Sequence, residues 1–403
     1  MISRLVQRAA CLIVLFAAAT LAAPGAASAH ANLVRTIPGN RAVLAHSPAR
    51  VVVRFDDDVR VAPGNAAIRN GDGSILLGKP SVHGRTLVIP LRAGLADGDY
   101  SVRWSAVSDD GHIVQGVLAF GVGLGRAPPV ASLRPTIEVG FGTVFSRWVF
   151  FAGLLLAAGL ALFDLLVWRP LAHGDLGTGW IAIPLAAMFV SAHGLVHASH
   201  GGAATRFGLT IDVASAVAAT GAAAAAIAIT DRAAAPFALV LAVALLPVPT
   251  VAGHALDPGR SWIEVPFDLL HVLASAVWIG GLFALALVVP REGAPPELVR
   301  AAARRFSKLA LASVLVLAAT GAARALAELS AVSQLWSTDY GRAILVKTAL
   351  FAVLLGLGWM SRSRVLANGV AGRLRNLVIV ELVLALGVVV AVAVLTSLRP
   401  GRS

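Results

Sequence analysis

The stretch GDYSVRWSAVSDDGH, residues 98–112, decides the fold of the N-terminal part of this chain. Tyr100, Trp104 and the valine between them alternate with serine and arginine. That alternation is typical of a β-strand with one buried face. The strand runs into Ser-Asp-Asp-Gly-His, where a glycine permits a tight turn between Asp110 and His112. The stretch therefore predicts a strand that carries these two side chains on the loop at its end.

Similar strand signals precede this stretch. Residues 51–55 (VVVRF) and 86–90 (TLVIP) are rich in β-branched side chains, and turn clusters such as NGDG at 70–73 separate the runs. Several short strands at close spacing are typical of a sandwich. We therefore predict an all-β sandwich or Greek-key barrel of the immunoglobulin-like kind over residues 30–122, followed by a linker at 123–140.

The N-terminus predicts a secreted domain with an unusual first residue. Two arginines precede an apolar run, and Ala-Ser-Ala ends at residue 29, so residues 1–29 have the pattern of a signal peptide. Cleavage there exposes the α-amine and the imidazole of His30. With Asp110 and His112 they form the nitrogen and oxygen ligand set that tetragonal Cu(II) prefers. If residues 1–29 instead stay attached as an anchor, His30 is an ordinary residue within the chain.

The composition indicates a membrane protein. Of 403 residues, 58% are hydrophobic and 13% are charged, whereas soluble domains carry about 25% charged residues. The formal charge of +12 comes from basic residues in short loops beside apolar spans, as membrane orientation requires. No basic helix suits phosphates, so a nucleic acid is not an expected partner. The single cysteine, Cys11, lies in the predicted signal peptide, so the mature chain offers no thiolate to a metal.

Beyond the linker, the chain predicts an all-α, polytopic membrane domain at 141–403 with eight transmembrane helices. The apolar spans are approximately 145–167, 179–199, 208–230, 235–254, 263–289, 308–326, 343–360 and 376–397. Eight crossings of the lipid bilayer return the C-terminus to the side of the secreted domain. Arginines cluster in the loops expected to face the cytoplasm. We expect a multi-pass protein of the bacterial cytoplasmic membrane with both its N-terminal domain and its C-terminus on the extracytoplasmic side.

Ionisable residues gather near the outer ends of three predicted spans. They are His193, His197 and His200 in the second span, His254 at the end of the fourth, and Glu264, Asp268 and His271 in the fifth. The spacing i, i+4, i+7 places each triplet on one helical face. Such groups are costly in lipid and mark a site or a pathway by default. They are the candidate copper path, with both stripes expected to face the interior of the bundle and the acidic groups expected to supply negative charge at its mouth.

The chain resembles two known families joined in one protein. The segments similar to the CopC copper-resistance domain are HANL at 30–33, SP at 47–48, YSVRW at 100–104 and SDDGH at 108–112. The segments that resemble the CopD family are GHA at 253–255, WIGGL at 278–282, RFS at 305–307 and YGR at 340–342. The resemblance to CopC–CopD fusion proteins implies a Cu(II)-binding sandwich outside the membrane and a copper-transporting membrane domain. It also implies that His30, Asp110 and His112 match the family's Cu(II) ligands. We expect a protein that is not an enzyme and that serves copper homeostasis or resistance. The sequence does not give the direction of transport, and import is the direction we expect.

One departure concerns the oxidation state of the copper. Met188 and Met360, the two methionines of the mature chain, both fall in predicted spans. Thioether ligands suit Cu(I), so the N-terminal domain is expected to hold Cu(II) alone. The membrane path is expected to take Cu(I) or Cu(II), and other extracytoplasmic copper carriers are possible partners.

Alternative functions remain open at this point. The protein could be a membrane-anchored copper store without transport, or an electron-transfer protein whose span histidines ligate haem. An N-terminal histidine with a second histidine is also found in enzymes that cleave polysaccharides oxidatively. Lys347 and Glu381 are either a buried pair or separate pathway residues. No nucleotide-binding motif is present, so transport driven by ATP is not expected.

Overall fold

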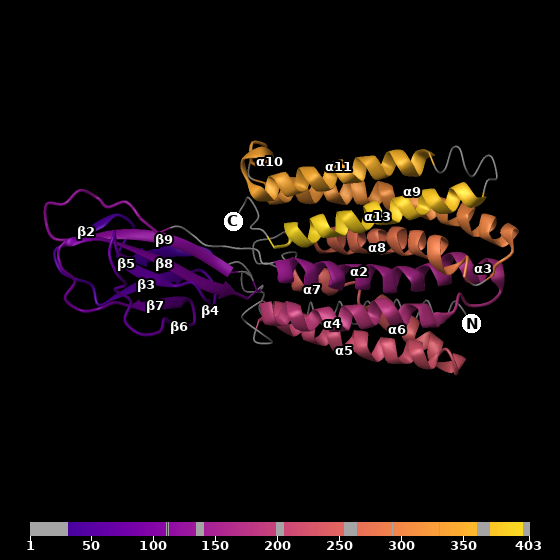
Figure 1. The fold of residues 1–403 in the computed structure, drawn as a ribbon, viewed down its shortest axis with the longest axis horizontal. Helices are drawn as coiled ribbons and strands as arrows, with labels where there is room; N and C mark the ends of the chain where they lie inside the picture. The colour runs from indigo at the N-terminus through magenta and orange to yellow at the C-terminus, as the bar shows by residue number, and fades with distance from the viewer. Residues whose placement is uncertain are drawn as a thin grey trace.

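The computed structural model describes residues 31–109, 111, 113–133, 141–198, 205–253, 264–291, 293–329, 331–360 and 371–397. Five predicted metal-site residues lie outside these ranges: His30, Asp110, His112, His200 and His254. The predicted signal peptide lies outside them too. The described chain forms two parts that lie end to end, a β domain at residues 31–133 and a membrane domain at residues 141–397 (Figure 1).

The β domain is a sandwich of two sheets, as the sequence predicts. Its strands are β1 (Leu33–Ile37), β2 (Ala42–Leu44), β3 (Arg50–Phe55), β4 (Val59–Val61), β5 (Ala66–Arg69), β6 (Ser81–His83), β7 (Thr86–Pro90), β8 (Gly98–Ser108) and β9 (Ile113–Val122). One sheet has the order β1-β3-β7-β6, and the other has the order β2-β9-β8-β4, with β5 also paired to β8. Every pairing is antiparallel except that of β2 with β9.

Aromatic side chains of β8 form part of the core, and Trp104 joins the two sheets. Trp104 meets Phe55 of β3 edge to face, with ring centroids 5.5 Å apart, and Tyr100 stacks on Phe120 of β9 at 5.4 Å. Both geometries are favourable for aromatic pairs. The buried members of the predicted alternating pattern therefore form the core of the sandwich, and β8 ends where the sequence places its metal-ligand loop.

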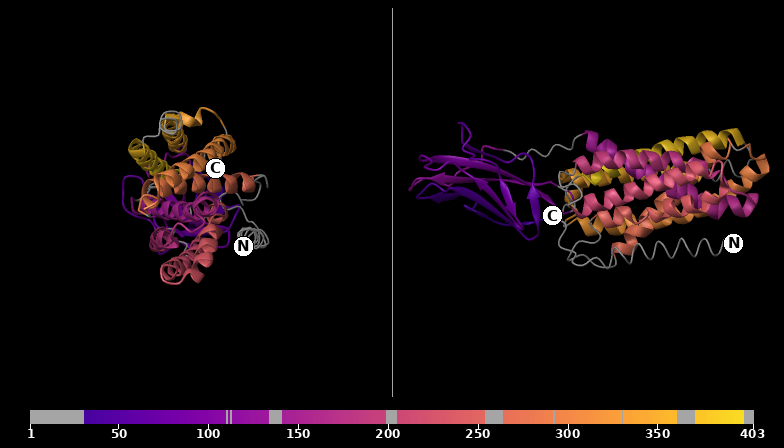
Figure 2. Two further views of the ribbon diagram at one scale, coloured as in Figure 1. Left: turned by 90° about the vertical axis from the view of Figure 1, so that its right-hand side faces the viewer. Right: turned by 90° about the horizontal axis from the view of Figure 1, so that it is seen from below.

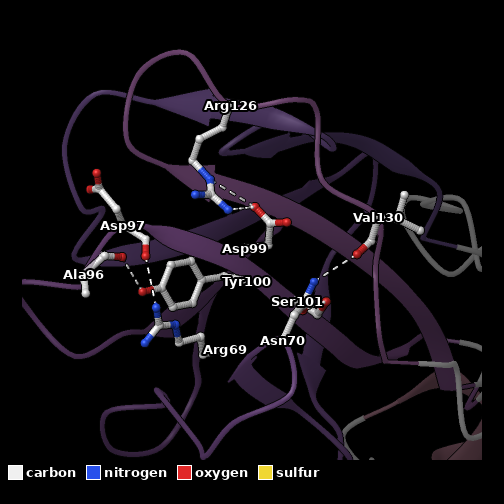
Figure 3. Close-up of polar contacts among 9 residues, drawn as sticks. All are labelled: Arg69, Asn70, Ala96, Asp97, Asp99, Tyr100, Ser101, Arg126 and Val130. Atoms are coloured by element: carbon white, nitrogen blue, oxygen red, sulfur yellow. Dashed lines mark hydrogen bonds and ion pairs between the residues drawn. The ribbon is translucent and has the colours of Figure 1, made fainter.

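The second face of β8 differs from the prediction of a half-buried strand. Ser101 and Ser105 are fully buried, and each makes a side-chain hydrogen bond: Ser101 Oγ donates to Asn70 Oδ1 at 2.6 Å, and Ser105 Oγ accepts from Gln115 Nε2 at 3.1 Å. The amide of Ser132 in the linker donates to Ser101 Oγ at 2.8 Å, and Asn70 Nδ2 donates to the carbonyl of Val130 at 3.0 Å (Figure 3). The linker is therefore bound along the sheet as far as residue 132.

The membrane domain is a bundle of long helices that run roughly along the long axis of the molecule (Figure 2). Its helices are α2 (Phe141–Phe163), α3 (Arg169–Ala172), α4 (Ala182–Ala198), α5 (Arg206–Ile227), α6 (Ala235–Ala244), α7 (Val248–Ala252), α8 (Glu264–Phe283), α9 (Pro296–Glu328), α10 (Gln334–Ser337), α11 (Asp339–Met360) and α13 (Ala371–Leu395). Short π-helical or 3₁₀ turns lengthen several of them: Asp164–Trp168, Thr178–Ile181, Arg232–Ala234 and Ala284–Val288.

Eight helical segments in the described chain are long and apolar enough to cross a membrane, which matches the predicted number of spans. The two largest extensions beyond the predicted ends are in the first and sixth spans. The first runs from Phe141 to Ala172, and the sixth begins at Pro296 rather than near 308. The arginine-rich residues between 297 and 308 lack the hydropathy of a span, yet they are good helix formers and continue the same helix.

Helix α2 packs against both α4 and α8. A side chain at Gly153 would put its Cβ 2.6 Å from the carbonyl oxygen of Pro184 on α4. A side chain at Gly159 would collide with the carbonyl of Ala276 on α8. These two glycines let α2 approach each neighbour at backbone distance. As a result, α2 lies between the two helices that carry most of the predicted membrane histidines.

Candidate metal site

The first described residues, Ala31 and Asn32, are fixed at one end of the β domain. Ala31 is 3% exposed. The amide of Asn32 donates to Asp56 Oδ1 at 2.7 Å, and its side-chain Nδ2 donates to Asp56 Oδ2 at 2.9 Å. Asp56 directly follows β3. These paired bonds hold the residues that follow His30 in the chain at the end of that strand.

Asp57 adds a buried carboxylate at the same end. Its side chain is 1% exposed, and its Oδ1 accepts a hydrogen bond from the amide of Asp58 at 2.8 Å. Its Oδ2 is buried and has no hydrogen-bond partner within the described part of the chain. Burial raises the pKa of Asp57, and the nearby negative charge of Asp109 adds to the rise. A cation bound nearby would therefore stabilise the charged form of this carboxylate.

The turn between β8 and β9 closes this end of the domain. Ser108 pairs with Val59 of β4, and the amide of Gly111 donates to the carbonyl of Ser108 at 3.0 Å. Gly111 has a φ of 78°, a left-handed conformation that glycine adopts without strain. The turn therefore exists where the sequence predicts it, and the segment of Asp57 and Asp58 leads into the strand beside it.

The same turn contacts the membrane domain at the start of α5. The amide of Phe207 donates to the carbonyl of Asp109 at 3.3 Å, and the amide of Arg206 donates to Asp109 Oδ1 at 3.2 Å. Thr205 caps the helix, since its Oγ1 accepts from the amide of Gly208 at 3.0 Å. Asp109 therefore accepts from amides at a helix N-terminus, where negative charge is favoured.

The start of α5 also contacts the end of α7. Arg206 Nη2 donates to the carbonyl of Gly253 at 2.9 Å. Gly253 immediately precedes His254 in the sequence. Three chain segments that flank predicted ligands, at Gly111, Arg206 and Gly253, are thus connected at the β-domain end of the bundle.

In α4, the described histidines form a pair on an exposed face. His193 and His197 have ring centroids 6.4 Å apart, and both side chains are exposed. The sequence predicts that this stripe faces the bundle interior and shares a site with the stripe on α8. That expectation is wrong for these two residues, because α2 packs between α4 and α8 and takes the interior position.

In α8, the predicted residues make specific contacts with α9. Asp268 is 5% exposed and forms an ion pair with Arg324, and Glu264 is half-buried. His271 Nδ1 lies 2.8 Å from Thr320 Oγ1, and that hydroxyl donates to the carbonyl of Val316 at 2.7 Å. With the hydroxyl hydrogen directed to Val316, the network assigns the ring proton of His271 to Nδ1, and Thr320 accepts its hydrogen bond. This assignment leaves Nε2 of His271 as the nitrogen with a lone pair for a metal.

The arrangement changes two roles expected from the sequence. The charge of Asp268 is compensated by Arg324, so this carboxylate is not a free negative charge at the mouth of a path. Within the described residues, no three histidine, cysteine, aspartate or glutamate side chains are grouped to hold a metal ion. Among the predicted membrane histidines in the described ranges, His271 is the one whose ring is held by a hydroxyl of a neighbouring helix.

The sequence leaves open whether Lys347 and Glu381 form a buried pair. Lys347 lies within electrostatic reach of Arg324 and His271. Glu381 lines a cavity of about 250 Å³ between α8, α9, α11 and α13, whose wall includes Trp278.

Several residues of this region could not be predicted from the sequence as part of the site. Arg324 is a charge inside an apolar span, and that signal alone could have marked it as the partner of an acidic group. Arg206 and Phe207 carry no such signal, because their role depends on a contact with a distant turn. Asp57 stands in a run of three aspartates, and only the fold shows which of them is buried.

Comparison with known proteins agrees with this organisation. The CopC domain family matches residues 33–123, and the family described as Copper resistance protein D matches residues 300–395. Copper transport protein CutJ of Bacillus subtilis is 26% identical over 421 residues, covering 93% of this chain and 75% of CutJ. Protein YobA of Escherichia coli is 29% identical over 98 residues, covering 23% of this chain and 79% of YobA.

Two solved structures are similar to the β domain. CopC from Methylosinus trichosporium OB3b is 29% identical, with a TM-score of 0.21, and the match covers 23% of this chain and 93% of that one. PcoC, a methionine-rich copper resistance protein from Escherichia coli, is 23% identical, with a TM-score of 0.20, and the match covers 23% of this chain and 99% of PcoC. The two family matches and the likeness to CutJ over 93% of this chain lead to one conclusion. This multi-pass membrane protein carries a CopC domain followed by a CopD domain, in the order of CopC–CopD fusion proteins of the copper resistance and transport families.

Proposed function

We propose that this protein binds Cu(II) at the membrane-facing end of its β domain and transports copper across the membrane, with import as the direction. The observation that carries the proposal is a convergence at one end of the sandwich. The anchored segment after His30, the buried carboxylate of Asp57 and the turn from Asp109 to Gly111 all lie there.

The donor chemistry fits Cu(II). His30 would supply its α-amine and imidazole, Asp110 a carboxylate and His112 a second imidazole, and these nitrogen and oxygen ligands suit a tetragonal ion. Asp57 would add negative charge from a buried position. The β domain has no methionine, so it offers no thioether for Cu(I).

This site requires a defined processing event. The α-amine of His30 becomes a ligand only if residues 1–29 are removed as a signal peptide. The mature protein would then consist of the copper-binding sandwich at 30–122, the linker at 123–140 and the membrane domain at 141–403. Secretion of the sandwich places it and the C-terminus on the extracytoplasmic side of the cytoplasmic membrane. Arg291 before α9 and the basic residues in the first turns of α9, at the far end of the bundle, support this orientation.

Within the membrane, the proposed copper path leads from His200 and His254 to His271. His271 presents Nε2 because Thr320 holds its Nδ1. His193 and His197 form a separate exposed pair on α4, which would take part at the rim rather than in the interior. The oxidation state of copper at His271 can be either one, since imidazole binds both.

Copper accumulation in cells tests this function directly. Cells that express the protein should contain more copper than cells without it, and replacement of His271 by alanine at matched membrane levels should remove the gain. Loss of copper on expression would indicate export instead. Purified protein carrying His112→Ala should bind Cu(II) more weakly than the wild type, whether the protein imports or exports copper.

A second candidate is a membrane-anchored copper store without transport. The separation of the α4 histidines from His271 by α2 favours it, since it leaves one well-placed ligand in the described bundle. A store would bind Cu(II) normally, yet copper inside the cells would not change with expression.

A further inference from the structure

The turn between β8 and β9 contacts the start of α5 in a small interface. This interface consists of Asp109 and Gly111 of the β domain and of Arg206 and Phe207 of the membrane domain. We propose that this interface, here named the transfer interface, holds the copper-site turn against the membrane domain so that copper passes between the two domains without release to solution. The proposal rests on the proposed function and extends it. It assigns Arg206 and Phe207 as positioning residues.

Three kinds of contact define the interface. The backbone amide of Phe207 and that of Arg206 both donate to Asp109, at 3.3 Å and 3.2 Å. The aromatic ring of Phe207 covers Gly111. A Cβ placed on Gly111 would lie 2.9 Å from Cδ1, 3.0 Å from Cγ and 3.2 Å from Cβ of Phe207. A glycine is therefore required at position 111 both by its φ of 78° and by the packing of this ring.

The receiving side of the interface is tied to several helices. The guanidinium of Arg147 on α2 lies over the ring of Phe207, 5.6 Å from its centroid, and also donates to the carbonyl of Thr396 after α13. Arg206 donates to the carbonyl of Gly253 after α7. The turn thus meets a platform connected to α2, α5, α7 and α13, and not a free loop.

The residues of the interface are close in the sequence to the predicted copper ligands. Gly111 stands between Asp110 and His112, the predicted ligands of the β domain. Gly253 stands before His254, and Arg206 follows the segment that contains His200. An interface that connects these three points brings the flanks of the donor and acceptor ligands together. Copper can then move by exchange of nitrogen and oxygen ligands, with no change of oxidation state required.

Disulfide trapping tests the interface without any assumption about transport. The mature chain has no cysteine, and a Cβ at residue 111 lies 3.2 Å from Cβ of Phe207, close to the separation in a disulfide. The double variant Gly111→Cys/Phe207→Cys, stripped of copper and treated with a thiol oxidant, should form an intramolecular bond. The matched control is Gly71→Cys/Phe207→Cys, because Gly71 has a similar φ of 80° but open space around it. Equal crosslinking of the two pairs would overturn the interface.

Copper uptake tests the role in transfer. Phe207→Ala should leave the Cu(II) affinity of the purified protein unchanged. It should raise the external copper concentration for half-maximal uptake by about 5-fold or more, with little effect on the maximal rate. Phe207→Leu should restore part of the loss. Phe237→Ala removes a phenylalanine of the membrane domain that is exposed on α6, away from this interface, and should behave as wild type.

The outcomes separate this proposal from the proposed function. If the wild-type protein does not transport copper, cells with the wild type or any variant take up no more copper than cells without the protein. The proposed function then fails together with the transfer role. If the wild type transports copper and Phe207→Ala does so with the same half-maximal concentration, the transfer role is overturned while the proposed function stands.

Discussion

His271 Nδ1 and Thr320 Oγ1 lie 2.8 Å apart, which joins the middle of α8 to α9. Because the Thr320 hydroxyl donates to Val316, the bond fixes the tautomer of the histidine and the direction in which Nε2 presents its lone pair. Metal-binding histidines in proteins commonly depend on such a partner for orientation.

Replacement of Thr320 by valine should therefore impair copper transport without removing a copper ligand. We expect an uptake defect of about 10-fold, because loss of the partner of a metal-binding histidine typically weakens the site by 10- to 100-fold. Thr320→Ser should restore uptake. Thr348→Val is the matched control, since Thr348 makes the same bond to the carbonyl four residues earlier but contacts no histidine. Uptake by Thr320→Val equal to that of the control would contradict the role of His271.

Replacement of Asp268 by asparagine should destabilise the membrane domain. The change leaves Arg324 without the carboxylate it is paired with, and we expect a loss of about 1–3 kcal/mol of unfolding free energy. The exposed pair Asp339–Arg342, at 2.7 Å, is the control, and Asp339→Asn should cost less than about 1 kcal/mol. Thermal unfolding in detergent measures both. A second change, Arg324→Gln, should recover part of the stability lost by Asp268→Asn, and the absence of recovery would argue against the pairing.

The variant Asp57→Asn should separate stability from copper binding. The carboxylate is buried with one oxygen unpartnered in the described chain, so its charge is costly without metal. We expect the copper-free variant to open more slowly than wild type in amide exchange of the strand from Gly98 to Ser108. Its Cu(II) affinity should fall, because a negative charge near the ion is lost. Asp58→Asn alters the exposed neighbour and should change neither quantity appreciably. Unchanged affinity in Asp57→Asn would place this carboxylate outside the copper site.

Tyr100 should make the stability of the β domain sensitive to alkaline pH. Its hydroxyl donates to the carbonyl of Ala96 at 2.5 Å, and burial raises its pKa above the ordinary value of 10.0, although the charge of Arg69 opposes the rise (Figure 3). The folded state thus binds the phenolic proton more tightly than the unfolded state. This stabilisation is present below about pH 10 and is lost as the pH rises through the folded-state pKa.

The variant Tyr100→Phe checks this expectation. It should lose about 1 kcal/mol at neutral pH with the hydrogen bond, and its stability should fall less steeply above pH 10 than that of the wild type. Tyr340→Phe, in the membrane domain, should leave the alkaline profile of the β domain unchanged. Parallel profiles for wild type and Tyr100→Phe would show that another group controls the alkaline transition.

Processing at residue 29 should be essential for tight Cu(II) binding. A mature protein with one extra alanine before His30 keeps both imidazoles but moves the α-amine away from the site. We expect its Cu(II) affinity to fall by more than about 10-fold. Mass spectrometry of the wild type should find His30 at the N-terminus, and equal affinities of the two forms would exclude the amine as a ligand.

The sequence is sufficient for the parts of the structure that local patterns determine. The alternation around Trp104 predicts β8, and the hydropathy of eight long runs predicts the spans, because burial of apolar side chains controls both. Family resemblance then predicts the copper chemistry. The family matches bear out the resemblance, whereas the individual ligands stay predictions because His30, Asp110 and His112 lie outside the described residues.

Contacts between helices could not be predicted in the same way. The histidine triplets share a helical face, but the sequence does not say which helix each face meets, and α2 occupies the position between α4 and α8 because Gly153 and Gly159 let it approach both. The pairing of Asp268 with Arg324 also depends on the relative register of α8 and α9. The contact of Gly111 with Phe207 joins two domains, so no periodicity could reveal it.

The linker bound along the β domain has a consequence for how often the two domains meet. Ser132 is bound to the sheet and α2 begins at Phe141, so the connection is nine residues long in sequence and can span about 30 Å at most. A connection this short keeps the turn near the start of α5 at an effective concentration in the millimolar range. Even a weak contact at Phe207 is therefore occupied most of the time, and the proposed copper site would stay beside the membrane domain without long-range diffusion.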